Sequence, residues 1–182
     1  VEKESISLTI NGRRFRFSVG DNMGDVSPAE TLIETLRQRL QMTGAKQSCG
    51  TGACGCCTVI VNGDAVASCM TLTVEMDRKS ITTIEGLGTP DKLHPMQAAF
   101  VKHDGYQCGY CTPGQVCSAV AVLDEIKRGI PSHVQDDITS RPRATNMEMR
   151  ERMSGNLCRC GAYSDIADAM AEVAGGKSGR RA

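Results

Sequence analysis

The sequence predicts an α+β protein in two parts, a small mixed sheet followed by an all-helical domain. Two Asn-Gly pairs, Asn11-Gly12 and Asn62-Gly63, each separate short stretches of alternating apolar residues, which is the pattern of a β-hairpin. Beyond residue 85 the alternation stops and apolar residues recur at helical spacing. We therefore expect one domain over 1–85, a second over 86–175, and a mobile tail over 176–182, which has no core pattern.

One helix is expected between the two hairpins of the first domain. Ser27 can act as its N-cap, Pro28 suits its first turn, and Glu30 completes a capping box. The helix should end near Gly44. Its apolar stripe consists of Leu32, Ile33, Leu36 and Leu40. The expected strands cover residues 5–18 as the first hairpin, 58–61 and 65–70 as the second, and 79–83 as a final strand.

The second domain shows four helical segments. Their expected bounds are Pro95–His103, Pro113–Arg128, Thr145–Met153 and Ser164–Val173. Gly129 can end the second of them, and Thr145 can form a capping box with Glu148 at the start of the third. The long connection 130–144 contains two prolines and should lie on the surface.

A cysteine-rich loop separates the predicted helix from the second hairpin. Cys49, Cys54 and Cys57 have the spacing C-x4-C-x2-C, which is that of a plant-type [2Fe-2S] loop. The glycines within this loop permit positive φ and let backbone N–H groups approach the sulfides closely. Cys69 is the only thiol beyond the loop and before residue 108, so we assign it as the fourth ligand. We call these four residues the loop set.

A second set of thiols lies in the helical domain. Cys108 and Cys111 form a C-x2-C pair directly before a helix, and Cys158 and Cys160 form a C-x-C pair between two helices. A C-x2-C pair is also typical of a thioredoxin-like dithiol, but no βαβ pattern surrounds this one. Together the two pairs supply four thiolates near helix ends, where a positive helix N-terminus favours an anionic cluster. We call these four residues the helical set.

The ten cysteines have other possible uses. Disulfides are disfavoured because neighbouring cysteines within each group are too close in sequence to bridge well. Structural zinc sites usually pair two C-x2-C knuckles, so iron–sulfur chemistry fits better, and a zinc-stabilised interaction module stays open as an alternative. Two cysteines are left as non-ligands. Cys56 should point away from the cluster, and Cys117 should be a buried helical thiol.

Composition and motifs argue against several function classes. The chain has 21 basic and 21 acidic residues and no basic run, which argues against a nucleic-acid partner. Its apolar runs are too short to span a bilayer. His94, His103 and His133 are scattered, and there is no Gly-rich phosphate loop, so the sequence shows no catalytic set. Two one-electron centres without a catalytic set indicate the electron-transfer part of a larger enzyme.

Three motifs follow one another along the chain. They are Cys49-x4-Cys54-Gly55-x-Cys57-Thr58, QCGYCTPG at 107–114 and SGNLCRCG at 154–161. In this order they resemble the iron–sulfur subunit of the xanthine dehydrogenase/aldehyde oxidase family of molybdenum hydroxylases. Residues 130–134 and 150–156 are most similar to the bacterial three-subunit aldehyde oxidoreductases. The resemblance implies a β-grasp, ferredoxin-like first domain and a four-helix bundle around a [2Fe-2S] cluster in the second.

The resemblance also implies cofactors and partners. A large subunit would hold molybdopterin, in its cytosine dinucleotide form, and a medium subunit would hold FAD. Electrons would pass from molybdenum through the helical set and then the loop set to FAD, during oxidation of aldehydes to carboxylic acids. Substrate chemistry would belong to the large subunit, so no catalytic residue is expected in this chain. Gln107 and Cys160 match family positions that lie against the pterin, which makes both candidate cofactor-binding residues.

Two further functions and the cellular compartment stay open. The chain could instead be the small subunit of an N-heterocycle hydroxylase, or a free-standing ferredoxin-like carrier. Some bacterial relatives work in the periplasm after folded export, so the resemblance favours the periplasm over the cytoplasm. No signal peptide is visible, because residues 1–12 alternate instead of forming an apolar run, and the start at Val1 is compatible with a removed leader.

Overall fold

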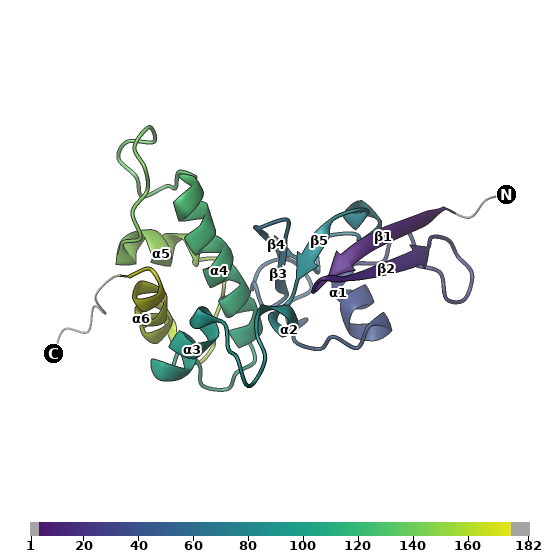
Figure 1. Cartoon of the computed structure of the whole chain (residues 1–182), viewed down its shortest axis with the longest axis horizontal. Coiled ribbons are helices and arrows are strands. Elements are labelled where there is room, and N and C mark those ends of the chain that lie inside the picture. Colours follow the sequence, from purple (N-terminus) through teal and green to yellow (C-terminus); the bar gives the residue numbers. More distant parts are fainter. Residues whose placement is uncertain (1–3, 176–182) are drawn as a thin grey trace.

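The computed structural model describes residues 4–175, so the predicted tail over 176–182 lies outside the described residues. The described strands come first in the chain and helices α2 to α6 follow, which gives a strand half and a helical half at opposite ends of the molecule (Figure 1). This is the mixed α+β architecture that the sequence predicts. Between residues 4 and 175, no helix is long and apolar enough to cross a bilayer.

Five strands form one mixed sheet in the order β2-β1-β5-β3-β4. Their bounds are β1 Ser5–Ile10, β2 Arg13–Ser18, β3 Thr58–Val61, β4 Asp64–Ala67 and β5 Ser80–Thr82. β1 runs parallel to β5, and the other neighbouring pairs are antiparallel. Asn11 and Asn62 both adopt a φ of 50°, a left-handed conformation that Asn tolerates in tight turns. Both predicted Asn-Gly hairpins are therefore confirmed.

A short helical segment packs on the sheet and begins at a different residue from the predicted one. α1 (Leu32–Glu34) continues as a π-helical turn, η1 (Thr35–Arg39). The N-cap is Thr31, whose backbone N–H donates to the Glu34 carboxylate at 2.8 Å. The predicted N-cap at Ser27 and the predicted end near Gly44 are therefore wrong. Three residues of the predicted stripe are fully buried in the core of the strand half: Leu32, Ile33 and Leu36.

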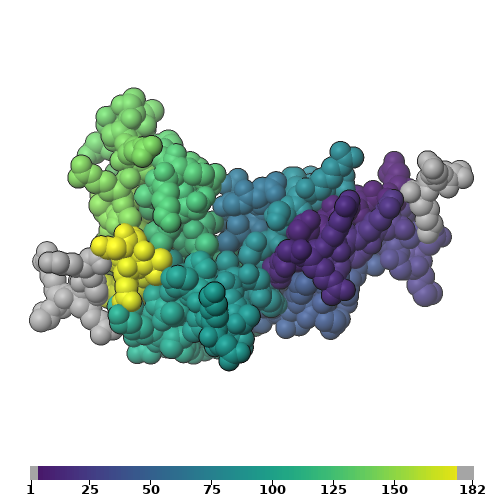
Figure 2. Space-filling view, viewed as in Figure 1, coloured from purple at the N-terminus to yellow at the C-terminus, as the bar shows by residue number. Residues whose placement is uncertain are grey.

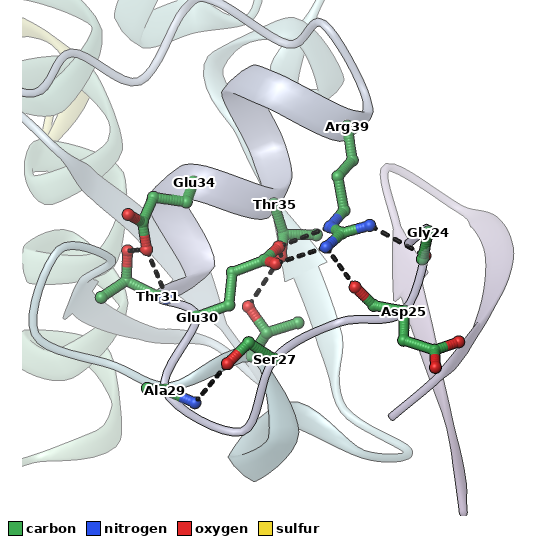
Figure 3. Close-up of polar contacts among 10 residues, drawn as sticks. Gly24, Asp25, Ser27, Ala29, Glu30, Thr31, Glu34, Thr35 and Arg39 are labelled. Atoms are coloured by element: carbon green, nitrogen blue, oxygen red, sulfur yellow. Dashed lines mark hydrogen bonds and ion pairs between the residues drawn. The ribbon is translucent and has the colours of Figure 1, made fainter. Parts of the chain in front are cut away.

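The Glu30 carboxylate explains why the helix does not begin at Ser27. Arg39 donates to both of its oxygens, with Nε–Oε1 and Nη2–Oε2 distances of 2.7 and 2.6 Å (Figure 3). The Thr35 hydroxyl donates to the same carboxylate at 2.5 Å. Burial opposes ionisation of Glu30, but the hydrogen bonds from Arg39 and Thr35 outweigh it and hold the pKa of Glu30 below its usual range. A carboxylate engaged by a guanidinium further along the chain is not available for a capping box.

The helical half contains α2 (Ile84–Leu87) and four longer helices. These are α3 Pro95–Lys102, α4 Thr112–Arg128, α5 Asn146–Arg152 and α6 Tyr163–Val173. All four agree with the predicted segments to within one residue at each end. Gly129, with a φ of 78°, ends α4 as predicted, because glycine adopts this left-handed conformation without a Cβ clash. The large buried side chains of this half include Met96, Phe100, Met149 and Met170.

A buried ion-pair network holds α5 against α4. The Arg152 side chain is only 6% exposed and donates to Glu148 and to Glu125, with N–O distances of 2.7 and 3.0 Å. It also donates to the backbone oxygen of Ile130, at the start of the connection between the two helices. Glu148 therefore serves Arg152, and only the Thr145 half of the predicted capping box is present, with Thr145 Oγ1 accepting from the Glu148 N–H. The connection predicted over 130–144 runs over 129–145 and lies at the surface, where it projects from the helical half (Figures 1 and 2).

Helix α4 also joins the two halves into one continuous surface (Figure 2). Its buried face meets β3, where Ile60 packs against Cys117 and Ala121. At its C-terminal end Arg128 pairs with Asp64 of β4 at 2.7 Å. The outer side of the sheet is therefore partly covered by the helix that begins at the second cysteine motif.

Candidate iron–sulfur sites

Three cysteines of the loop set lie on the chain segment between η1 and β3. Gly50, Gly52 and Gly55 all have positive φ, between 68° and 74°, so the chain between the cysteines turns back on itself repeatedly. Cys57 directly precedes β3, and Cys69 follows β4, so the second hairpin returns Cys69 to the loop. Cys57 and Cys69 are buried, whereas Cys49 is exposed.

The thiols of the loop set are arranged in pairs. The Cys54 thiol contributes to the lowered pKa of Cys49, and the Cys57 thiol contributes to the raised pKa of Cys69, so Cys54 acts on Cys49 and Cys57 acts on Cys69. The backbone N–H of Thr51 lies 3.4 Å from Cys49 Sγ, and together with the Cys54 thiol it lowers the pKa of Cys49 to about 6. Burial, followed by the neighbouring Cys57 thiol, raises the pKa of Cys69 to about 11. The exposed end of the set is thus prepared to ionise, while the buried end needs a cation to hold its thiolates.

The helical set is assembled from three helix ends. Cys111 is the N-cap of α4, Cys108 is exposed three residues before it, and Cys158 and Cys160 lie between α5 and α6. Burial, followed by the neighbouring Cys158 thiol, raises the pKa of Cys111 to about 12. Burial also opposes ionisation of Cys158, but the backbone N–H groups of a nearby three-residue turn, together with the Cys111 thiol, lower its pKa overall. The turn consists of Cys160, Gly161 and Ala162.

These donor sets fit two-iron clusters. Between residues 4 and 175, no group of three or more His, Cys, Asp or Glu side chains converges as it would around a single metal ion. A [2Fe-2S] cluster instead takes two thiolates on each of two irons, and in both sets one thiol shifts the pKa of another, as expected of neighbouring thiols. Backbone N–H groups directed at Cys49 and Cys158 provide the hydrogen bonds that stabilise anionic sulfur.

A pocket of about 400 Å³ lies between the two sets. Its walls include Cys54 from the loop set and Cys108, Cys111 and Cys158 from the helical set. The backbone N–H of Leu157 donates to the Cys54 carbonyl at 2.9 Å, and Leu157 is bonded directly to Cys158. One hydrogen bond therefore connects Cys54 of the loop set to the residue directly before Cys158 of the helical set.

Comparison with known proteins identifies the kind of site. Residues 9–82 match the 2Fe-2S iron-sulfur cluster binding domain family, and residues 83–171 match the [2Fe-2S] binding domain family. The chain is 54% identical over 170 residues to the aldehyde oxidoreductase iron-sulfur-binding subunit PaoA of Escherichia coli K12, covering 93% of this chain and 71% of that protein. It is 36% identical over 166 residues to one subunit of a probable xanthine dehydrogenase of Bacillus subtilis, covering 91% and 83%.

The chain belongs to the iron–sulfur subunits of the xanthine dehydrogenase/aldehyde oxidase family of molybdenum hydroxylases. Solved structures agree with this assignment. Quinoline 2-oxidoreductase from Pseudomonas putida 86 has a chain 37% identical to this one, with a TM-score of 0.75 over 96% of this chain and 94% of that one. The aldehyde oxidoreductase of Desulfovibrio desulfuricans is 36% identical with a TM-score of 0.77, and this chain covers 17% of its length.

The non-ligand positions of this iron–sulfur subunit show one departure from expectation. Cys56 does not point away from the site, since it lines the pocket between the sets. Burial, followed by the contact with Cys54, raises the pKa of Cys56 to about 12, so it stays a neutral thiol. Cys117 is buried on α4 as predicted. His94 caps α3 and His103 contacts Glu172 at 2.6 Å, so both have structural partners.

Two polar residues near the sets were missed by the sequence interpretation. Asn156 is 8% exposed, and its side-chain amide donates to the Gly55 carbonyl at 3.2 Å, across the junction of the two halves. Gln115 is 2% exposed on α4, where its side chain donates to the Asn156 carbonyl at 2.8 Å. The signal for Gln115 was available, because it is a polar residue directly beside the apolar stripe of a predicted helix. Asn156 had no such signal, since it lies outside any helix or strand.

Proposed function

We propose that the chain binds two [2Fe-2S] clusters and relays single electrons between a molybdenum subunit and an FAD subunit. The observation that carries this proposal is the shared pocket lined by cysteines of both sets. When bound, each cluster supplies one-electron chemistry, and two close clusters shorten each electron-transfer step. Cys108 and Cys49 are the exposed ends of the two sets, so each set is open to a different partner surface.

The thiol pairs also suggest how the residues divide between the irons. We expect Cys49 with Cys54 on one iron of the loop set and Cys57 with Cys69 on the other. In the helical set Cys111 pairs with Cys158, which leaves Cys108 with Cys160. The protein's part is to bring the pairs together, to hold them with backbone N–H groups, and to keep water from the buried half of each site.

The proposal also includes the surfaces that would contact the two partner subunits. Gln107 is exposed directly before the exposed Cys108, and Cys160 is half-buried. We propose that both contact molybdopterin, in its cytosine dinucleotide form, on the large subunit, and that the FAD subunit covers the loop set. The division into a β-grasp domain over 1–85 and a four-helix-bundle domain over 86–175 is part of the same proposal, supported by the change from strands to helices near residue 84.

Aldehydes are the proposed substrates of the complete enzyme. This rests on the 54% identity to a subunit named for aldehyde oxidoreductase. The small subunits named for nicotine 6-hydroxylase and nicotinate dehydrogenase are each 36% identical, so an N-heterocycle hydroxylase is the second candidate. Turnover assays of the complete enzyme with an aldehyde and with a nicotinate-type ring distinguish the two. The compartment stays a prediction, with the periplasm favoured over the cytoplasm, and cell fractionation tests it.

The first experiment is analysis of iron, acid-labile sulfide and zinc in the purified chain, with low-temperature EPR after reduction. About four irons and four sulfides per chain, with two distinct signals, support the two clusters. Zinc without sulfide would establish the alternative of a zinc-stabilised interaction module.

The second experiment tests the relay in the complete enzyme. In Cys108→Ser, substrate should still bind, but FAD reduction by substrate should be lost because the entry side of the relay is broken. FAD reduction at the normal rate would contradict the proposed order. A chain that purifies folded and cluster-loaded with no partner subunit would favour the free-standing carrier instead.

A further inference from the structure

A buried asparagine lies at the junction of the two cysteine sets. Asn156 is 8% exposed and stands two residues before Cys158 of the helical set. Its Nδ2 donates to the Gly55 carbonyl at 3.2 Å and to the Thr58 hydroxyl at 3.5 Å. Gly55 directly follows Cys54 of the loop set. One side-chain amide of the helical half therefore bonds to the cysteine-rich loop of the strand half.

The helical half fixes the backbone of Asn156 through two helices. Its carbonyl accepts from Gln115 Nε2 at 2.8 Å, and Gln115 is 2% exposed on α4. Its backbone N–H donates at 2.9 Å to the carbonyl of Met153, which is the C-cap of α5. The direction of the Asn156 side chain therefore depends on the packing of α4 and α5 and not on the local chain alone.

The loop fits closely against the Asn156 amide. A Cβ added at Gly55 would lie 2.6 Å from Asn156 Nδ2, so the approach depends on a residue without a side chain. The Gly55 carbonyl also accepts from the Thr58 hydroxyl at 2.7 Å, so both of its lone pairs have donors. A Cβ added at Gly114 of α4 would lie 2.3 Å from the same oxygen. Because these atoms are in close contact, a change of the Asn156 side chain should shift the loop relative to the helical half.

A second hydrogen bond lies directly beside this contact. The Leu157 N–H donates to the Cys54 carbonyl at 2.9 Å, and Leu157 and Cys54 are the chain neighbours of Asn156 and Gly55. Two adjacent hydrogen bonds between the same two segments fix their relative orientation, whereas one hydrogen bond alone permits rotation about it. Since each segment carries a ligand candidate, the two bonds together determine how the loop set lies against the helical set.

We propose that Asn156 is a positioning residue that sets the separation of the two cysteine sets and thereby the rate of electron exchange between them. In this exchange one electron leaves the helical set and enters the loop set, with no bond made or broken and no proton taken up. Electron transfer becomes much slower as the distance between two centres grows, so a small displacement at the junction is enough to slow it. This inference rests on the proposed relay through two clusters.

The test measures the magnetic interaction between the two clusters by low-temperature EPR, after the full chain has been reduced with dithionite. In Asn156→Leu the side chain has a similar size but no donor, so the Gly55 carbonyl loses one partner and the two segments should move apart. The splitting of the EPR signals should be reduced or lost, because the dipolar interaction falls with the cube of the distance. The reduction midpoint of each cluster should stay as in wild type, since the thiols and the net charge are unchanged.

Asn146→Leu is the matched control. Asn146 is exposed on α5, and its side chain accepts a hydrogen bond from Arg150 Nε of the same helix at 2.6 Å. This variant removes the same amide from the same half of the molecule, but it removes no hydrogen bond to the loop set. Its EPR splitting should therefore equal that of wild type.

Asn156→Asp and hydrogen exchange provide a second variant and a second measurement. A carboxylate has nearly the same shape but only accepts, so it cannot bond to the Gly55 carbonyl. Exchange of the Leu157 N–H reports on the junction whether or not iron is loaded, and it should be faster in both variants than in wild type. Unchanged exchange at Leu157, or an unchanged EPR splitting in a variant with full iron content, would overturn the proposal. Wild-type chain without iron and sulfide would instead disprove the clusters themselves.

Discussion

The two cysteine sets are built in different ways, although each supplies four thiols. In the loop set, three of the four cysteines lie within nine residues of one loop, and a hairpin returns the fourth. In the helical set, Cys111 and Cys158 are separated in sequence by α4, the projecting connection and α5, yet they line the same pocket. The loop set is therefore mostly local, whereas the helical set exists only when the helices are packed.

This difference predicts that the two clusters can be lost separately. Cys158→Ser should remove the helical-set cluster and leave the loop-set cluster, and Cys57→Ser should do the reverse. In each variant the iron content should fall from about four to about two per chain, since each set is proposed to bind two irons. Iron analysis with EPR measures both. Loss of all iron in both variants would show that the two sets assemble as one unit.

The next largest effect is expected at the ion-pair network that packs α5. Arg152→Met leaves Glu148 buried without its partner, and breaking a buried pair in this way costs about 3–5 kcal/mol. During urea unfolding of this variant, the helical-set cluster should be released first. The loss of its visible absorption measures this release. Arg128→Met is the control, because Arg128 and Asp64 are both substantially exposed, and its effect should be small. Equal destabilisation by the two variants would contradict the expectation that the buried ion pairs of Arg152 stabilise the protein more than the exposed pair of Arg128.

A smaller effect is expected at the junction between the sets. A Cβ added at Gly114 would lie 2.3 Å from the Gly55 carbonyl oxygen, so Gly114→Ala must push the first turn of α4 away from the loop. Such overpacking costs about 1–3 kcal/mol, and it should weaken the magnetic interaction between the reduced clusters measured by EPR. Gly155→Ala is the matched control, since nothing lies within 4 Å of its added Cβ. If the magnetic interaction between the clusters is unchanged in Gly114→Ala, the residues at the junction accommodate the added methyl group without moving the two sets apart.

The smallest effect concerns pH and belongs to the strand half. The folded-state pKa of Glu30 lies below 4.5 because Arg39 and Thr35 outweigh the effect of burial, so its contribution to stability is present above that pH. This contribution is lost as the pH falls through the folded-state pKa. The stability difference between wild type and Glu30→Gln should therefore shrink from pH 6 to pH 4, as measured by urea unfolding. A difference that stays constant over this range would contradict the assignment.

Sequence patterns performed well where a structure depends on neighbours in the chain. The bounds of the four helices of the second half were predicted to within one residue. The two Asn-Gly hairpin turns and the end of α4 at Gly129 were also predicted correctly. They failed at α1, where two capping boxes compete. Thr31 with Glu34 is chosen over Ser27 with Glu30 because Arg39 engages the Glu30 carboxylate. That choice depends on a residue two turns further along, which a capping rule does not consider.

The sequence by itself determined the two cysteine sets, the family and the order of strands and helices, because these follow from short spacings and from apolar periodicity. Only the tertiary structure decided which thiols share a pocket, where Cys56 lies, that Gln115 bonds to Asn156, and that Asn156 joins the two halves. Those contacts connect residues far apart in the chain. They arise when α4 packs on the sheet and on α5, and no local pattern specifies which distant side chains this packing brings together.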